Sequence, residues 1–307
     1  MNTSPLQLEE FSATVLAVPP LARGADLALD VAQNQRLVQH MEAGGHRILL
    51  YAGNANLYHC GLSDYAQLLD LLAEHTAPTT RVIPAIGPDF GKMMDQARLL
   101  RGTGYRTAVV LPMQGFTSAA GVVEGISRFV DLAGIPVTLY LKSEQYLDIE
   151  SLGKLVDAGR IIAVKYAVVR EDPTRDPYLE ALVRRISAAR IVSGMGERPA
   201  PVHLSRFGLA SFTTGCGCIA PRTCMQLLSA LKRGDLSAAE SLHARFMPLE
   251  NLREEVSLIR VLHDAVTLSG LADMGPQLPL LSASPPERLA EIKALAITLL
   301  AYERSLE

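Results

Sequence analysis

The sequence predicts an α/β fold, namely a (β/α)8 TIM barrel followed by a C-terminal helical domain. Short runs rich in β-branched residues alternate with stretches of helical period as far as Arg233, which is typical of a parallel sheet with crossover helices. Eight such runs occur, and only helical patterns follow the eighth. The length of 307 residues suits a barrel of about 250 residues with an appendage.

The predicted strands are short and apolar. They lie at residues 13–18, 47–51, 81–86, 107–111, 137–141, 161–165, 191–193 and 210–213. Helical patterns separate them at residues 29–43, 63–74, 90–101, 119–133, 149–158 and 178–188. Gly44, Gly102, Gly134 and Gly159 follow four of these helices, where glycine commonly ends a helix. The seventh crossover, residues 194–208, is short and interrupted by proline.

Three further helices are predicted after the last strand, at residues 220–233, 237–268 and 286–300. We therefore expect a barrel domain at residues 1–233 and a helical appendage at residues 234–307. A doubly wound Rossmann-type sheet is the competing fold. It requires a glycine-rich phosphate loop after the first strand, where Val18-Pro19-Pro20 stands instead.

Composition and charge exclude several classes of protein. Apolar residues make up 49% of the chain and charged residues 20%, which is typical of a globular protein and not of a disordered one. The net charge is -3 and no run of Lys and Arg resembles a polyanion-binding patch, so we expect neither nucleic acid nor a membrane as partner. No segment has the pattern of a membrane span or a signal peptide. Four cysteines are too few for a disulfide framework, and we expect a cytoplasmic protein.

Lys165 is the first candidate catalytic residue, because catalytic groups of a TIM barrel lie at the carboxyl ends of its strands. Strand alternation puts Lys165 on the same face as Ile161 and Ala163. The chain has only six lysines against 23 arginines. Desolvation at the strand end would lower the amine pKa and leave a nucleophile toward a carbonyl carbon, as a Schiff-base lysine requires. A lysine that reaches from the strand end to solvent is the structural alternative.

Tyr140 ends the preceding strand. Neighbouring barrel strands lie about 4.8 Å apart, so Tyr140 and Lys165 can reach one substrate, and the phenol can carry its protons. The alternative is a tyrosine that caps the core with its hydroxyl in water. The loop after the second strand contains Gly53, Asn54 and Asn56, whose backbone N–H groups and carboxamides suit a carboxylate. An ordinary Gly-Asn turn explains the same residues.

Five segments, in order, resemble the dihydrodipicolinate synthase and N-acetylneuraminate lyase family. They are ILLYAGNAN, VVLPMQG, IPVTLY, IIAVKYA and GLASFTTGCGCIAP. The helical tail, with VLHDAVTLSGLADMGPQLPLL, extends the resemblance over most of the chain. The resemblance implies a TIM barrel with a C-terminal helical domain, a homotetramer, and a Schiff base between a 2-keto acid and the strand-six lysine. By position, Lys165 would be that lysine and Tyr140 the proton-relay tyrosine.

The chain departs from the family pattern at the substrate-binding positions. The family's strand-two loop has Thr or Ser, then Thr-Gly-Glu, after its first glycine, whereas Gly53 is followed here by Asn54-Ala55-Asn56. The synthase also has a Tyr after the strand-four proline and an Arg a few residues beyond the strand-five tyrosine, and this chain has neither. We therefore expect an activity other than dihydrodipicolinate synthesis. Residues 193–198 resemble the sugar-acid dehydratase branch, which makes Glu197 and Arg198 candidate substrate contacts.

The sequence thus predicts a class I Schiff-base lyase, an aldolase or a dehydratase, that acts on a small sugar-derived 2-keto acid. No metal or organic cofactor is expected, because the lysine imine supplies the electron sink. Cys216, Cys218 and Cys224 offer three thiols, whereas structural zinc takes four ligands and no histidine has suitable spacing. The alternative is a degenerate barrel that binds a keto acid or other carboxylate without turnover, which the altered strand-two loop favours. A mean hydropathy of +0.18 without tryptophan favours a homo-oligomer, a tetramer or a dimer.

Overall fold

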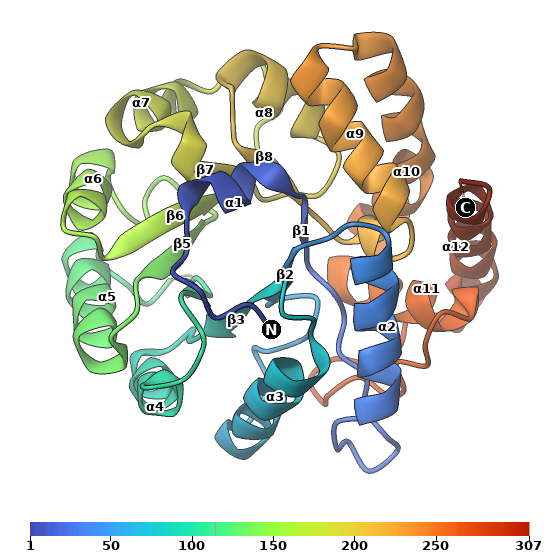
Figure 1. Ribbon diagram of the computed structural model, residues 1–307, viewed down its shortest axis with the longest axis horizontal. Coiled ribbons are helices and arrows are strands. Elements are labelled where there is room, and N and C mark those ends of the chain that lie inside the picture. Colours follow the sequence, from blue (N-terminus) through green and yellow to red (C-terminus); the bar gives the residue numbers. More distant parts are fainter. Residues whose placement is uncertain (114, 307) are drawn as a thin grey trace.

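A computed structural model describes residues 1–113 and 115–306 of the chain. Within these residues, parallel strands form a closed barrel in the order β1 to β8, and β1 pairs with β8. Helices surround the barrel, and further helices follow it at the C-terminal end of the chain (Figure 1). The prediction of a (β/α)8 barrel with a C-terminal helical region is confirmed.

The strands of the barrel are short and almost entirely buried. They are β1 (Leu16–Ala17), β2 (Ile48–Tyr51), β3 (Arg81–Ile86), β4 (Ala108–Val110), β5 (Val137–Leu141), β6 (Ile161–Tyr166), β7 (Ile191–Ser193) and β8 (Ser211–Thr214). The α-helices are α1 (Leu8–Ala13), α2 (Val31–Ala43), α3 (Leu62–His75), α4 (Phe90–Leu100), α5 (Ala119–Ala133), α6 (Ile149–Asp157), α7 (Pro177–Ile186), α8 (Ala200–Phe207), α9 (Pro221–Arg233), α10 (Leu236–Val256), α11 (Leu258–Ser269) and α12 (Leu289–Arg304).

Aspartates start many of the crossover helices. The side chains of Asp30, Asp89, Asp148 and Asp176 accept hydrogen bonds from backbone N–H groups in the first turns of α2, α4, α6 and α7. A cap of this kind stabilises a helix by about 1 kcal/mol. The caps therefore fix where each loop at the carboxyl ends of the strands gives way to a helix.

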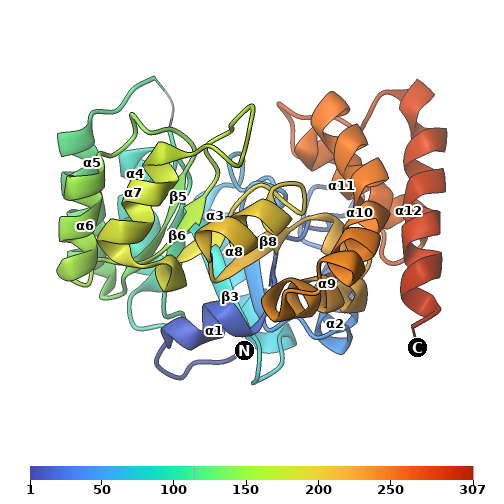
Figure 2. The same cartoon turned by 90° about the horizontal axis from the view of Figure 1, so that it is seen from above.

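The predicted strand at residues 13–18 is wrong at its start. Ala13 is the last residue of α1, and β1 comprises only Leu16–Ala17. The N–H of Gln7 donates a hydrogen bond of 2.9 Å to the Glu10 carboxylate, which closes the first turn of α1. The helix buries Phe11 and lies across the amino-terminal end of the barrel (Figures 1 and 2). This end of the barrel is therefore covered, and the opposite end is left for a site.

The glycines after the helices divide into two kinds. Gly102, Gly134 and Gly159 have φ of +77°, +74° and +69°, the left-handed conformation expected after a helix. Gly44 ends α2 as expected, but with φ of -82° and so without the left-handed conformation. A side chain is excluded at Gly44 for another reason, since an added Cβ would lie 2.2 Å from Pro221 Cγ.

The single helix predicted at residues 237–268 is two helices. Ser257 has extended backbone angles, with φ of -177° and ψ of 125°, and separates α10 from α11. Its side chain accepts a hydrogen bond from Arg260 N–H and so caps the second helix. The break turns the first residues of α11 toward the mouth of the barrel.

The C-terminal helices lie beside the barrel, as Figure 2 shows for α10, α11 and α12. α10 contacts α9, α11 and α12, and α11 packs along α12. The short crossover predicted at residues 194–208 contains α8, an eight-residue helix. The domain boundary after residue 233 stays a prediction. In the described part of the chain, every helix is too short or too polar to cross a membrane.

Candidate active site

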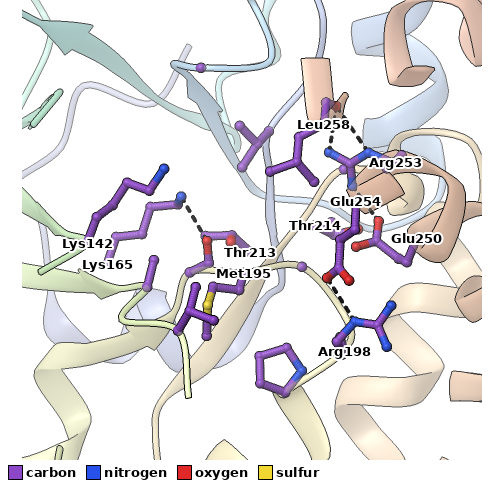
Figure 3. Close-up of a pocket in the computed structure, with 18 of the residues that line it drawn as sticks. Lys142, Lys165, Met195, Arg198, Thr213, Thr214, Glu250, Arg253, Glu254 and Leu258 are labelled. Atoms are coloured by element: carbon purple, nitrogen blue, oxygen red, sulfur yellow. Dashed lines mark hydrogen bonds and ion pairs between the residues drawn. The ribbon is translucent and has the colours of Figure 1, made fainter. Parts of the chain in front are cut away.

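A cavity of about 590 Å³ opens at the carboxyl ends of the strands. Its walls come from the ends of β5, β6, β7 and β8, from the loop after β2, and from α10 and the start of α11. Figure 3 shows Lys142 and Lys165 on one side of the cavity and Glu250 and Arg253 on the other. The polar and charged residues that line it are Asn54, Tyr58, Tyr140, Lys142, Lys165, Arg170, Glu171, Arg198, His203, Thr213, Thr214, Glu250, Arg253 and Glu254.

Lys165 lies on β6 and reaches into the cavity with 5% of its surface exposed. Its Nζ donates a hydrogen bond of 3.0 Å to the carbonyl oxygen of Gly194. Burial lowers the pKa of Lys165 well below its usual value, and the nearby charges of Lys142 and Arg253 lower it further. The lowered pKa favours the uncharged amine, which is the nucleophilic form.

Gly194 leaves the room that this lysine occupies. An added Cβ at Gly194 would lie 2.8 Å from Lys165 Cγ and 2.8 Å from the carbonyl oxygen of Tyr166. Both distances are too short for a real contact. The absence of a side chain at the end of β7 thus permits the position of the lysine stem on β6.

Tyr140 pairs with Lys165 in the register of β5 and β6. The Nζ of Lys165 lies 3.5 Å from the centroid of the Tyr140 ring, and the Nζ of Lys142 lies 5.8 Å from it. Burial raises the pKa of Tyr140, so the phenol keeps its proton at neutral pH. The predicted proximity of Tyr140 and Lys165 is confirmed, with the amine over the face of the ring.

The loop after β2 contributes two of its three candidate residues to the cavity. Gly53 and Asn54 line it. The Asn54 side chain donates to the Val18 carbonyl at 2.7 Å and accepts from the Arg253 guanidinium at 3.4 Å. Asn56 is not among the lining residues and is buried with φ of +53°, a conformation that asparagine tolerates well in turns. Asn56 therefore shapes the turn outside the cavity walls, and its role as a substrate contact stays a prediction.

Glu197 and Arg198 separate in the structure. Glu197 is fully buried behind the cavity, where its carboxylate meets the Thr214 hydroxyl, and its role as a substrate contact stays a prediction. Burial and the neighbouring Glu250 raise the pKa of Glu197 to about 8. Arg198 lies at the exposed rim and forms an ion pair of 2.8 Å with Glu254. Of the two, Arg198 lines the cavity.

Two lining residues that sequence reasoning missed are Glu250 and Arg253 of α10. They form an ion pair, and both side chains are almost completely buried. Acidic and basic residues three positions apart on a helix are usually a solvent-exposed pair, so their spacing carried no signal of a site. The helical region therefore supplies charge to the barrel mouth.

The cysteines lie next to this charged pair. Cys216 Sγ is 2.8 Å from Glu250 Oε1, and the side-chain ligand atoms of Glu197, Cys216 and Glu250 lie within 4.8 Å of one another. Burial raises the pKa of Cys216 well above its usual value, and Arg253 already neutralises Glu250. A protonated thiol and a compensated carboxylate are poor ligands for a cation.

The cavity thus combines a buried amine of lowered pKa, a protonated phenol against it, and a buried guanidinium across from it. An uncharged lysine amine can attack a carbonyl carbon, and a phenol can donate and accept the protons that this addition requires. A guanidinium suits a carboxylate. The arrangement can hold and activate a small carbonyl acid.

Comparisons with known proteins agree with this fold. The 4-hydroxy-tetrahydrodipicolinate synthase of Mycolicibacterium paratuberculosis is 24% identical over 280 residues, covering 89% of this chain and 91% of that protein. YagE, a dihydrodipicolinic acid synthase family protein from E. coli K12 solved in complex with pyruvate, superposes with a TM-score of 0.80 at 19% identity, covering 93% of this chain and 98% of that chain. The N-acetylneuraminate lyase of Proteus mirabilis superposes with a TM-score of 0.80 at 14% identity, covering 94% of this chain and 98% of that chain.

The sequence model of the dihydrodipicolinate synthetase family matches residues 19–297, which include the whole barrel from β2 to β8 and most of the helical region. The resemblance seen in the sequence segments is therefore confirmed over most of the chain. Known proteins of this fold include lyases. This chain belongs to the dihydrodipicolinate synthetase family.

Proposed function

We propose that this protein is a class I lyase that forms an imine between Lys165 and a small, sugar-derived 2-keto acid. The observation that carries the proposal is the buried amine of Lys165, which lies 3.5 Å from the centroid of the Tyr140 ring inside the cavity and has a lowered pKa. Membership of a family of lyases supports the reaction class. The relative that was solved with pyruvate supports a 2-keto acid as ligand.

The proposed chemistry begins with attack of the Lys165 nitrogen lone pair on the keto carbon. The nitrogen loses a proton, the former carbonyl oxygen gains protons and leaves as water, and a C=N bond replaces the C=O bond. Tyr140 donates and accepts protons in these steps. The protonated imine then takes up the electron pair released when a C–C bond breaks in aldol cleavage, or when a proton is lost before a hydroxyl leaves in dehydration.

This chemistry requires no metal or organic cofactor, because the imine is itself the electron sink. We further propose that the protein works in the cytoplasm as a homo-oligomer, a tetramer or a dimer. The exposed side chains of Phe116 and Leu280, each 88% accessible, support subunit contacts.

Trapping of the imine tests the proposal. We expect pyruvate or a longer 2-keto acid, reduced with borohydride, to add a covalent mass to Lys165 alone, as read by intact mass and peptide mapping. Lys165→Ala should abolish the adduct and still fold. Lys154→Ala is the matched control, because the Lys154 side chain is 72% exposed and lies outside the cavity. An adduct on Lys142 or Lys154 instead, or none with any keto acid, would overturn the proposal.

Turnover separates the lyase from a barrel that only binds its ligand. The missing hydroxyls of the loop after β2 favour binding without turnover. We expect sugar-derived 2-keto acids to be cleaved or dehydrated at rates that Lys165→Ala abolishes. An imine that forms without any product from a panel of such acids would establish the binding protein instead.

A further inference from the structure

Arg253 is a charged residue of the cavity for which the imine chemistry gives no role. It lies on α10, outside the barrel, and only 4% of its surface is exposed. Its guanidinium nevertheless lines the cavity. A buried charge is costly unless its surroundings compensate it, so the position of Arg253 requires an explanation.

The surroundings of Arg253 hold the guanidinium in one orientation. Nη1 donates to the Glu250 carboxylate. Nε and Nη2 donate to the carbonyl oxygen of Leu258, the first residue of α11, at 3.2 and 3.1 Å. Nη2 also donates to Asn54 Oδ1 at 3.4 Å. A guanidinium has five N–H groups, so these four bonds leave one on Nη1 for a ligand.

The end of β8 is built around this guanidinium. An added Cβ at Gly215 would lie 2.5 Å from Arg253 Nη1 and 2.6 Å from its Cζ. Gly215 follows directly on β8, so the guanidinium lies against the backbone at the carboxyl end of the barrel. A side chain at this position would exclude Arg253 from the mouth of the cavity.

Arg253 lies across the cavity from the imine-forming amine. Figure 3 shows Lys165 entering from β6 and Arg253 from the opposite wall, with Thr213 between them. The guanidinium also contacts Asn54 in the loop after β2. Its charge lowers the pKa of both Lys165 and Tyr140, so the three groups share one electrostatic environment.

The other cations of the cavity are less suited to a carboxylate at the keto carbon. Arg170 forms ion pairs with both Glu144 and Asp176. Arg198 lies at the rim with its side chain 43% exposed. Lys142 is exposed, on the same side as Lys165. Arg253 is thus the buried cation on the wall opposite the amine, within the part of the chain that the structure describes.

We propose that Arg253 binds the carboxylate of the 2-keto acid and so orients its keto carbon toward Lys165. The proposal rests on the proposed imine chemistry and adds the group that recognises the acid. A desolvated guanidinium forms strong charge-assisted hydrogen bonds to a carboxylate. The charges also match, since the Glu250–Arg253 pair is neutral and the incoming carboxylate balances the positive charge of the protonated imine.

Two probes of equal size separate recognition of the carboxylate from any structural effect of Arg253. Pyruvate carries the carboxylate, and pyruvamide replaces it with an uncharged carboxamide. Each is trapped on the full-length protein with cyanoborohydride, which delivers hydride to the imine carbon, and the rate of adduct formation is read by intact mass. The ratio of the two rates measures the preference for the charge.

The test variant is the double substitution Glu250→Gln with Arg253→Met, because Met alone would leave a buried carboxylate without its partner. Glu250→Gln alone serves as its reference. We expect pyruvate trapping to fall by about 30-fold or more and pyruvamide trapping by about 3-fold or less. Arg253→Lys, which keeps the charge and loses the planar fork, should give an intermediate ratio.

Arg245→Met is the matched control, an arginine on the same helix whose guanidinium lies 4.4 Å from the Tyr302 ring on the surface. It should leave the ratio of the two rates unchanged. If the double variant lost trapping rate equally with both probes, Arg253 would be a purely structural residue. If it lost trapping rate with neither probe, Arg253 would have no part in binding. Both outcomes overturn this inference and leave the imine chemistry intact. Absence of any adduct in the unmodified protein would instead overturn the proposed function, and this inference with it.

Discussion

Gly194→Ala tests how closely the end of β7 holds Lys165. The added Cβ would lie 2.8 Å from Lys165 Cγ and from the Tyr166 carbonyl oxygen, whereas ordinary contacts begin near 3.4 Å. The Tyr166 oxygen accepts a hydrogen bond of 2.6 Å from the Gly194 N–H, so it belongs to the sheet and cannot turn away. The methyl group must therefore separate β6 from β7 or displace the lysine stem.

Overpacking of this kind costs about 1 to 3 kcal/mol of unfolding free energy. In a large domain that lowers Tm by roughly 2 to 8 °C. A displacement of the amine by about half an ångström, with loss of its bond to the Gly194 carbonyl, should slow imine trapping by about 10-fold or more. Thermal unfolding and pyruvate trapping with cyanoborohydride measure the two effects separately.

Gly125→Ala is the control for this substitution. Gly125 lies within α5, and its added Cβ would meet only Phe90 Cδ2 at 3.8 Å. Alanine in a helix should raise the unfolding free energy by about 0.5 to 1 kcal/mol and leave trapping unchanged. If Gly194→Ala matched this control in both Tm and trapping rate, the spacing of β6 and β7 would not govern the position of Lys165.

Four further predictions concern single groups of the site. Tyr140→Phe should retain some imine formation and lower turnover by about 100-fold, and unchanged turnover would make Tyr140 a packing residue. Pyruvate with aspartate semialdehyde should give kcat/KM below about 10⁴ M⁻¹s⁻¹, and a higher value would establish dihydrodipicolinate synthesis. The pKa of Lys165 is lower in the folded than in the unfolded chain, so between these two pKa values stability rises with pH. Lys165→Met should therefore raise Tm at neutral pH. A lower Tm would contradict the inference that burial of the Lys165 amine lowers the stability of the fold. The pKa of Glu197 is raised from 4.5 to about 8, so the contribution of Glu197 to stability falls as pH rises through that range. Glu197→Gln should therefore flatten the decline of Tm between pH 5 and 8 relative to the unmodified protein.

Much of the barrel and the centre of the site could be predicted from the sequence. Strand positions follow from β-branched runs, and adjacent parallel strands end at the same edge of a sheet. Tyr140 and Lys165 each end such a run, and the structure pairs them in register. The prediction held because both residues depend on local pattern and on topology alone.

The rest of the site depends on tertiary contacts. Asn54 and Asn56 look alike in the sequence, yet Asn54 lines the cavity and Asn56 is buried outside its walls with a positive φ. Glu197 and Arg198 are neighbours, but one points into the core and the other to the rim. Arg253 lies about 90 residues beyond Lys165, and its approach depends on how α10 packs against the barrel. Local periodicity carries no information on such packing.

The break at Ser257 has a consequence for how this scaffold diversifies. The carbonyl of Leu258 that anchors Arg253 belongs to the first residue of α11, so its position depends on the break between the two helices. The charge opposite the amine is thus set by a few residues of the appendage, while every strand that builds the core lies elsewhere in the chain. Substitutions in one turn of α10 can therefore change which acids the barrel accepts, and the eight strands with their lysine need not change at all.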